Sequence, residues 1–258
     1  VRRVCGARRS RTPRRAVRGE ALDSDIMKEL EEHLNYSFQN KELLVQALTH
    51  TSFANEAHSG HLGSNERLEF LGDAVLELVS SDFFYREKTQ LSEGELTKLR
   101  ASFVCEPALA YCAEQIPLSP YLLLGRGEEM TGGRTRPSIV SDAMEAVVGA
   151  LYLDGGLEIA RDFIERFILN DIEGKRYFYD AKTILQEEIQ KDKDAVLSYE
   201  LLTETGPEHL KRFTVAALRD GVAIAEGTGS SKKEAEQRAA YAALLTLGIA
   251  ESGGTSCT

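Results

Sequence analysis

The sequence predicts a multi-domain protein in which an all-α domain over residues 23–170 precedes a small α+β domain over residues 180–248. Three observations support this division. Apolar residues recur at spacings of three and four from Asp25 to about Asn170, as in helices packed on a core. Short segments of alternating polarity appear only towards the C-terminal end. Residues 171–179 follow neither pattern and indicate a linker.

The first domain shows helical periodicity without any strand pattern. Asn40 and either Ser64 or Asn65 are suited to helix N-caps, and Pro107 is suited to a first turn. We expect helices near residues 24–34, 40–48, 65–87, 91–104, 106–116, 138–153 and 156–169.

The second domain has the order α-β-β-β-α. Helical patterns flank three alternating segments, and Asp220-Gly221 between the last two is a strong signal for a two-residue hairpin turn. An antiparallel sheet with both helices on one face accounts for this order. The expected elements are a helix over 180–193, strands over 197–205, 211–219 and 222–228, and a helix over 231–247.

Both ends of the chain are expected to be disordered tails, over residues 1–22 and 249–258. The first 18 residues hold eight arginines and no acid. An over-extended translation start or a solvated tail is favoured over an RNA-binding arm. A transit peptide is disfavoured, because serine is scarce and the segment has no amphipathic face.

Cysteine usage and hydropathy indicate a cytoplasmic protein. The four cysteines show no CxxC spacing, which argues against a disulfide framework or a zinc site and fits a reducing compartment. No apolar stretch approaches the ~20 residues that span a bilayer, so no membrane partner is expected.

The charge balance excludes nucleic-acid binding through net charge. The chain carries −10, and beyond residue 18 it holds 23 basic and 41 acidic side chains. A polyanion such as RNA would therefore bind through local basic patches and bridging cations.

The predicted helix over 65–87 carries one acidic face. Glu66, Glu69, Asp73 and Glu77 lie three or four residues apart, and no lysine or arginine occupies the interleaved positions. Like charges so spaced cost about 0.2–0.5 kcal/mol per pair. A merely solvated face remains the alternative for this helix taken alone, although such a face normally mixes signs.

The predicted helix over 138–153 is apolar on most sides, with Asp142 and Glu145 as its only charged residues. A buried pair of carboxylates needs neutralisation by basic side chains, by protonation or by a metal ion. Glu69, Asp73, Asp142 and Glu145 could together hold Mg²⁺, with Mn²⁺ as a substitute, because all-oxygen ligation suits these ions. Such clusters hydrolyse phosphodiesters by activating a bound water.

One segment, NERLEFLGDAVL over residues 65–76, resembles the signature of the ribonuclease III family along its whole length. Supporting segments lie at 47–55, 125–129, 132–134 and 138–146, and the resemblance extends over residues 25–248.

The resemblance implies a bacterial-type endoribonuclease that cuts double-stranded RNA with Mg²⁺. It assigns Asp73 and Glu145 as catalytic and, with Glu69 and Asp142, as metal-binding. Glu66 would be a nearby acid concerned with RNA or the partner subunit, and Glu93 an outer acid.

The family resemblance also implies a homodimer and particular products. Two active sites in one valley would each cut one strand, leaving 5′-phosphates, 3′-hydroxyls and short 3′ overhangs. The expected substrates are precursors of ribosomal RNA and some messenger RNAs.

The second domain resembles a double-stranded-RNA-binding domain, which reads A-form shape. Thr183, Gln186 and Glu187 would face 2′-hydroxyls, His209 would enter a minor groove, and Lys232 and Lys233 would meet phosphates at a helix start. Alone, the lysines suit an ordinary solvated helix start and His209 an exposed loop, but their joint occurrence in order favours RNA binding. Nine basic against twelve acidic side chains in this domain predict modest, salt-sensitive affinity.

Two further features of the sequence give weaker indications of function. His50 is interpreted as a structural hydrogen-bonding residue rather than a catalytic one. Residues 125–133 are glycine-rich but lack the lysine and hydroxyl of a nucleotide-binding loop, so we expect no organic cofactor and a flexible loop near the RNA backbone.

Two rival functions come from other classes. A non-cleaving regulator that binds duplex RNA would need an incomplete acid set, whereas all four acids are present. A helical metallohydrolase for a small phosphorylated molecule would have no use for a domain that reads RNA shape.

Overall fold

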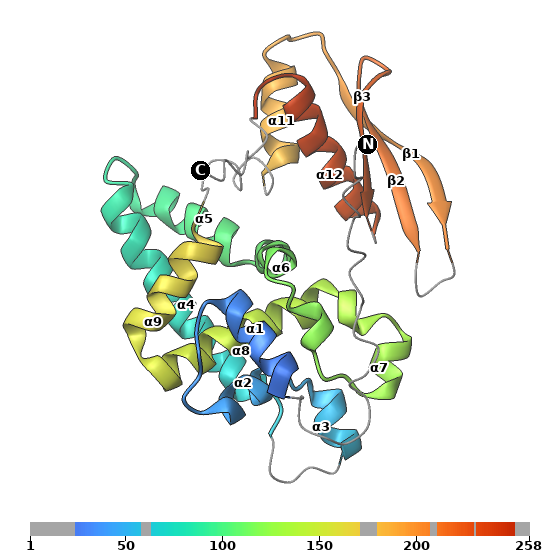
Figure 1. The fold of residues 1–258 in the computed structure, drawn as a ribbon. Coiled ribbons are helices and arrows are strands. Elements are labelled where there is room, and N and C mark those ends of the chain that lie inside the picture. The colour runs from blue at the N-terminus through green and yellow to red at the C-terminus, as the bar shows by residue number, and fades with distance from the viewer. Residues whose placement is uncertain (1–23, 58–62, 171–179, 207–210, 230, 251–258) are drawn as a thin grey trace, which may run out of the picture.

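The computed structural model describes residues 24–57, 63–170, 180–206, 211–229 and 231–250, which form a helical domain and an α+β domain (Figure 1). The predicted fold class is confirmed. The expected tail over 1–22, the linker over 171–179 and residues 251–258 lie outside the described residues.

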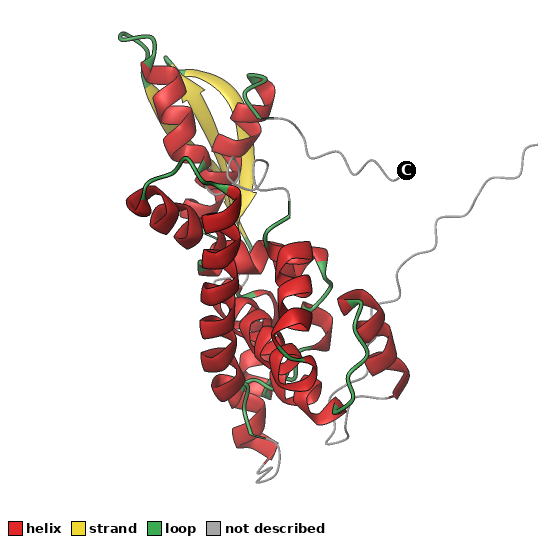
Figure 2. Cartoon of the chain, turned by 90° about the vertical axis from the view of Figure 1, so that its left-hand side faces the viewer, coloured by secondary structure: helices red, strands yellow, loops and turns green. Residues whose placement is uncertain are grey.

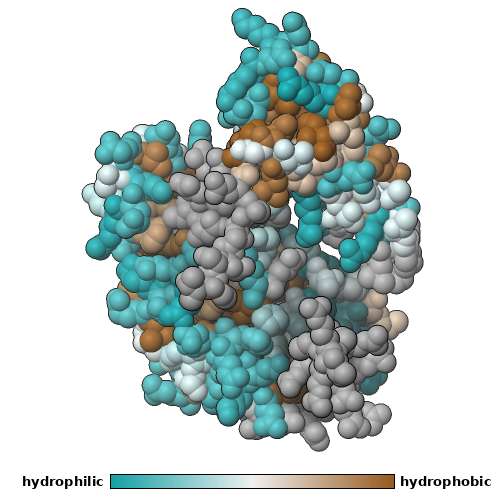
Figure 3. Space-filling view, turned by 45° about the horizontal axis from the view of Figure 1, so that its top comes forward, coloured by the Kyte–Doolittle hydropathy of each residue, from teal (hydrophilic) through white to brown (hydrophobic). Residues whose placement is uncertain are grey.

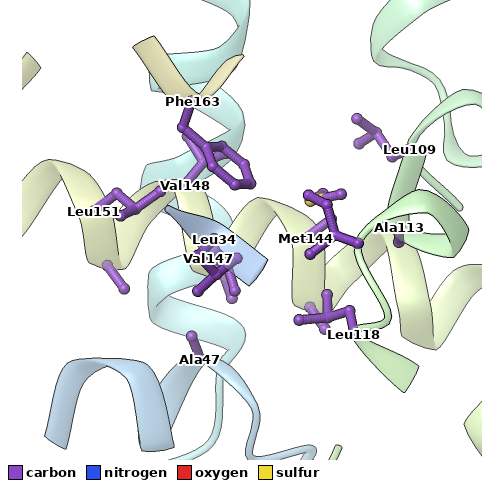
Figure 4. Packing of buried hydrophobic residues seen from close by; sticks show 14 of the residues in the cluster. Leu34, Ala47, Leu109, Ala113, Leu118, Met144, Val147, Val148, Leu151 and Phe163 are labelled. Carbon is purple, nitrogen blue, oxygen red and sulfur yellow. The ribbon is translucent and has the colours of Figure 1, made fainter. Parts of the chain in front are cut away.

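Helices α4 and α8 form the centre of the first domain. Helix α8 is buried on most sides between Ile139 and Leu151, because nearly every residue in this stretch is apolar or small. Leu34, Leu118 and Phe163 from surrounding segments pack around this helix (Figure 4). The α-helices of this domain are α1 (Ser24–Leu34), α2 (Lys41–Ala47), α3 (Thr51–Ala57), α4 (Glu66–Glu87), α5 (Glu93–Val104), α6 (Glu106–Gln115), α7 (Arg126–Met130), α8 (Pro137–Gly155) and α9 (Leu157–Phe163).

The predicted helix starts are confirmed at two positions and not at a third. The Asn40 side chain accepts a hydrogen bond from the Glu42 amide, and Pro107 lies in the first turn of α6. Asn65 does precede α4, but its side chain makes no capping bond. The backbone N–H of this buried residue donates to the Thr49 carbonyl at 2.8 Å, which ties the start of α4 to the segment after α2.

Two short helices correct the sequence analysis. No helix was predicted over α3, and α7 occupies residues expected to form a flexible loop. Contacts from distant residues hold α7 in place. The Glu56 carboxylate of α3 accepts the Arg126 amide at 2.9 Å, and Arg134 beyond α7 binds the Glu129 carboxylate. Arg134 also donates to the carbonyls of residues 119, 120 and 122, so this glycine-rich stretch is fixed rather than loose.

The last predicted helix of the domain is shorter in its regular part than expected. Regular α9 gives way at Ile164 to a turn of π-helix over Ile164–Ile168. Short 3-10 turns at Ser119–Tyr121 and Gly133–Thr135 lead from α6 to α7 and from α7 to α8.

The second domain has the predicted order and one antiparallel sheet, with strands in the order β1-β2-β3. The Asp220-Gly221 turn joins β2 to β3 with positive φ at both residues, 54° and 79°, as the dipeptide predicts. The elements are α11 (Ala181–Gln190), β1 (Leu197–Thr205), β2 (Arg212–Arg219), β3 (Val222–Gly229) and α12 (Lys232–Thr246).

Helices α11 and α12 share one side of the sheet, which is drawn in yellow in Figure 2. Gly227 lets α12 lie directly on β3, since a Cβ there would lie 2.1 Å from the Ala239 amide nitrogen. Leu185, Ala217 and Leu244 belong to the small core between these layers. Ala250 is buried in the same core, so the packed domain extends two residues beyond the predicted boundary at 248.

Hydrophilic side chains cover much of the described surface seen in Figure 3, with hydrophobic residues in smaller areas. Within the part of the chain that the structure describes, no helix combines the length and apolar character that crossing a membrane requires.

Candidate active site

The two acid-bearing helices cross at a pair of glycines. A Cβ at Gly72 of α4 would lie 1.8 Å from the Glu145 carbonyl oxygen of α8, and one at Gly149 would lie 2.3 Å from the Leu68 carbonyl oxygen. Backbone therefore touches backbone at this crossing. Because Glu69 and Asp73 flank Gly72 while Asp142 and Glu145 lie on the facing helix, the crossing brings the two acid pairs together.

Glu145 lies near the other three carboxylates, because the charges of all three act on its pKa. Burial raises the pKa of Glu145 to about 8, and the charges of Asp73, Glu69 and Asp142 add to the rise. Burial, followed by the charges of Asp142, Glu66 and Asp73, raises the pKa of Glu69. Burial also raises the pKa of Asp142. Packing thus brings Glu145 near the other three acids, and their common role in holding a metal ion stays a prediction.

No lysine or arginine of the described chain neutralises these carboxylates, although the charge of His50 lowers the pKa of Asp142. In residues 24–57, 63–170 and the described part of the second domain, no lysine or arginine forms an ion pair with any of the four. Elsewhere the helical domain pairs its acids, as in Arg161 with Asp82 and Arg100 with Glu77. Beyond the charge of His50 on Asp142, the acid site is thus left with protonation or a bound cation as its means of neutralisation.

The donor set fits a hard divalent ion. Among the residues that the structure describes, no three acidic, histidine or cysteine side chains gather tightly enough to form a ready-made metal site. Mg²⁺ does not require such a cage, because it keeps several waters and binds through one or two carboxylates together with substrate phosphates. Oxygen donors on two fixed helices, half-buried and short of positive charge, suit this mode of binding.

The two outer acids of the sequence analysis have different positions. Glu66 is exposed and accepts a hydrogen bond from the Ser64 hydroxyl, and its charge raises the pKa of Glu69. Glu93 is exposed at the start of α5, where it accepts a hydrogen bond from Thr97, and it is not among the groups that shift the pKa of Glu69, Asp142 or Glu145.

Two groups beside Asp142 were not assigned to the acid site from the sequence. Glu106, the first residue of α6, contributes the largest charge effect on the pKa of Asp142, and His50 lowers that pKa. Glu106 precedes Pro107 and was seen only as part of a helix start. No spacing along the chain links either residue to Asp142, because tertiary packing alone makes them neighbours.

The predicted RNA-binding residues of the second domain lie at two places. Thr183, Gln186 and Glu187 share one face of α11, with Thr183 and Glu187 exposed. Lys232 and Lys233 are exposed in the first turn of α12, where the Ser231 side chain caps the helix by accepting the Glu234 amide. His209 lies outside the described residues.

Comparisons with known proteins agree on one family. The model of ribonuclease-III-like domains matches residues 40–172, and the model of the double-stranded RNA binding motif matches residues 181–247. Ribonuclease 3 of Listeria innocua is 47% identical over 221 residues, which cover 85% of this chain and 96% of the relative. Ribonuclease 3 of Halalkalibacterium halodurans is 49% identical over 229 residues, covering 88% and 87%. The chain belongs to the ribonuclease III family.

A solved structure of a ribonuclease III nuclease domain is also similar to this chain. The nuclease domain of the Campylobacter jejuni enzyme, described with structural flexibility in a region involved in dimer formation, is 43% identical, with a TM-score of 0.51. The match covers 55% of this chain and 95% of that domain. Like its relatives in the ribonuclease III family, the chain is an endoribonuclease for double-stranded RNA, with a helical nuclease domain followed by an RNA-binding domain.

Proposed function

We propose that this ribonuclease III hydrolyses phosphodiester bonds of duplex RNA at the α4–α8 crossing, using Mg²⁺ held by Glu69, Asp73, Asp142 and Glu145. One observation carries the proposal. At a backbone contact between two helices, the charges of Asp73, Glu69 and Asp142 add to the raised pKa of Glu145, and no lysine or arginine of the described chain forms an ion pair with these acids.

The division of labour among the acids is the one that the resemblance to the ribonuclease III family implies. Mg²⁺, when bound, supplies a water of lowered pKa and positive charge for the leaving oxyanion. Glu69 and Asp142, on facing helices, hold the ion. Asp73 and Glu145 would complete the ligand set and orient the attacking water. Hydrolysis with the 3′ oxygen as leaving group gives 5′-phosphate and 3′-hydroxyl ends.

A homodimer would supply one such site for each RNA strand. The exposed face of α4 supports this part of the proposal. Phe70, Leu78 and Tyr85 lie seven or eight residues apart on one side of that helix and are 81%, 56% and 74% exposed. Large apolar side chains arranged in this way are typical of protein interfaces. Paired sites offset along a duplex leave short 3′ overhangs.

The second domain would hold the duplex by shape. Backbone amides at the start of α12 and the charges of Lys232 and Lys233 favour phosphate, while Thr183 and Gln186 offer hydrogen bonds to 2′-hydroxyls. His209 is proposed to enter a minor groove. Natural substrates would be structured precursors of ribosomal RNA and some messenger RNAs, processed in the cytoplasm.

The decisive experiment compares the wild-type chain with E145Q on a long, perfect RNA duplex, in Mg²⁺, in Mn²⁺ and in chelator. We expect E145Q to lose at least about 10³-fold in cleavage rate, because the amide can neither ligate as an anion nor accept a proton. Duplex binding should remain within about threefold of wild type. E158Q, which alters an acid on the exposed side of α9, is the matched control and should cut normally.

Product analysis completes this test. Chelator should abolish cleavage, and fragments should carry 5′-phosphates. Undiminished cutting by E145Q, or cleavage that persists in chelator, would refute the metal assignment. A wild-type chain that binds the duplex and leaves it intact in Mg²⁺ would contradict the nuclease function itself.

A further inference from the structure

An ion pair between Lys182 and Glu236 joins the two helices of the second domain, which pack side by side (Figure 1). Lys182 is the second residue of α11, and its Nζ lies 2.6 Å from Oε2 of Glu236 in the second turn of α12. Both side chains are partly exposed. By contrast, the ion pair of Lys191 with Glu188 lies at the end of α11 alone.

Tyr199 of β1 also holds the Lys182 side chain. The Lys182 Nζ lies 4.9 Å from the centre of the Tyr199 ring, which is within the range of attraction between a cation and an aromatic face. The ring packs against the core between the sheet and the helices. Its hydroxyl is buried without a hydrogen-bond partner in the described chain, and burial together with the charge of Glu236 raises the pKa of Tyr199 to about 12. Lys182 is thus fixed by two elements, α12 through Glu236 and β1 through Tyr199.

The ion pair lies one helical turn from each group of predicted RNA contacts. Gln186 follows Lys182 by four residues on α11, and Lys232 precedes Glu236 by four residues on α12. Residues four apart lie on the same face of a helix. The pair therefore joins α11 to α12 close to the point from which both sets of contacts extend.

The packing of α12 determines its position along α11 only weakly. The buried face of α12 consists of four alanines and one leucine: Ala235, Ala239, Ala240, Ala243 and Leu244. Alanines let two helices approach closely, but their side chains form low ridges that interlock less than long side chains do. A directed polar contact between the helices can therefore set how α11 lies against α12.

We propose that Lys182, Glu236 and the ring of Tyr199 position α11 relative to α12, so that the contacts on both helices meet one RNA duplex together. A domain of this kind spans about 16 base pairs and contacts two successive minor grooves and the phosphates between them. The separation of its contact groups thus decides whether all contacts are made at once. This inference rests on the proposed function, since it assumes RNA contacts on both helices.

The sign of one substitution separates positioning from simple electrostatics. E236Q removes a negative charge one turn from the predicted phosphate contacts, so charge alone predicts tighter RNA binding. Positioning predicts weaker binding, because Lys182 loses its partner on α12. The matched control is E188Q, since the Glu188 side chain is also ion-paired and is 29% exposed, against 31% for Glu236.

The test measures binding of the full chain to labelled RNA duplexes in chelator, with the integrity of the RNA checked afterwards. On a duplex of about 20 base pairs, which presents both minor grooves, E236Q and K182M should bind about three- to tenfold more weakly than wild type. The double variant should bind no more weakly than either single one, because both changes break the same contact. K182R, whose guanidinium can still reach Glu236, should stay within about twofold of wild type, as should E188Q.

A shorter duplex and thermal unfolding separate positioning from a general loss of structure. On a duplex of about eight base pairs, which is too short to present both grooves, the difference between E236Q and wild type should disappear. The unfolding temperature of E236Q should stay within about 5 °C of wild type, because a partly exposed ion pair adds little to stability. A larger drop would assign the pair to folding rather than to positioning.

The remaining outcomes each decide the question. Unchanged or tighter binding by E236Q, an equal loss in E188Q, or an equal loss on the short duplex overturns the positioning role. If E236Q does not fold, K182M and K182R give the same test, and equal binding by these two overturns the role. K233E reports on the proposed function: if it binds the long duplex like wild type, the RNA contacts assigned to α12 are wrong and this inference falls with them.

Discussion

Glu145 shows how the surroundings of one side chain set its chemistry. Burial comes first among the causes that raise its pKa to about 8, and three neighbouring carboxylates follow. Without a cation this group holds a proton near neutral pH. A bound divalent ion would reverse the balance, because it stabilises the ionised form. Metal binding to this site is therefore expected to release protons.

The stability of the metal-free protein should depend on the pH through Glu145. Its pKa in the folded chain lies above the ordinary value of 4.5, so the folded state binds the extra proton between about 4.5 and 8. The free energy of unfolding then falls as the pH rises through that window. E145Q removes the ionisable group, so in chelator at pH 8 it should be more stable than wild type by about 1–3 kcal/mol, after allowance for screening.

Urea denaturation in chelator at pH 5 and pH 8 measures this difference. The gap between E145Q and wild type should shrink at the lower pH, where the wild-type carboxyl is protonated in the folded state. Equal stabilities at pH 8 would mean that the carboxylate is already neutralised by the protein.

Helices α4 and α8 determine the site through their contact rather than through their individual sequences. At Gly72 the atoms nearest to an added Cβ belong to the backbone of Glu145 and Gly149, which cannot rotate away as a side chain would. The distance between the two acid pairs is thus linked to the absence of a side chain at this crossing. Helix packing and metal binding here depend on the same residues.

G72A should therefore separate the helices. We expect a loss of about 2–4 kcal/mol in stability, together with a loss of cleavage, because Glu69 and Asp73 move away from Asp142 and Glu145. The matched control is G94A in α5, where an added Cβ meets nothing within 4 Å. That variant should keep full activity and wild-type stability or gain slightly. Thermal unfolding and cleavage assays measure both, and a fully active, stable G72A would contradict the close contact.

Short elements limited the prediction of helices from sequence. The long helices α4 and α8 were expected within two residues of their ends, because many apolar positions define their periodicity. Helix α7 has five residues, too few for a periodic signal, and α3 has no fully buried residue over 51–56 and so no clear apolar face. The α7 region is held in place by the contact of Glu56 with Arg126 and by the bonds from Arg134 to the carbonyls before α7, and no local pattern reports such contacts.

At the scale of the whole molecule, the described residues form two separate hydrophobic cores. One gathers around α8, and the other lies between the sheet and its two helices. Each core belongs to one functional domain, so cutting and duplex binding are separable in principle. The acidic body makes this division important, because the nuclease domain has little net attraction for RNA.

Removal of residues 175–258 should weaken duplex binding strongly at physiological salt while some cleavage persists at low salt. Electrostatic screening is weaker at low salt, so remaining cationic contacts and bound Mg²⁺ suffice for encounter. Binding and cleavage measured across a salt series provide the test. If the truncated chain bound RNA as tightly as the full one, the roles given to the domains would be wrong.

Assembly is the second property of the whole molecule that can be tested. Sedimentation should give a particle near twice the 28.5 kDa chain mass. F70E should shift it towards the monomer, because a charge would replace the most exposed large apolar residue of α4. M130E, at a residue 79% exposed on α7, is the control and should stay dimeric. A fully active wild-type monomer would contradict the paired sites.

The spacing of residues along the chain was sufficient to place Glu69 with Asp73 on one helix face and Asp142 with Glu145 on another, and to predict the hairpin at Asp220-Gly221. Each of these features follows from local backbone geometry, which repeats every few residues. The meeting of the two acid pairs, and the presence of Glu106 and His50 beside Asp142, depended on how the helices pack. Packing joins residues from distant parts of the chain, and no periodicity within one segment carries that information.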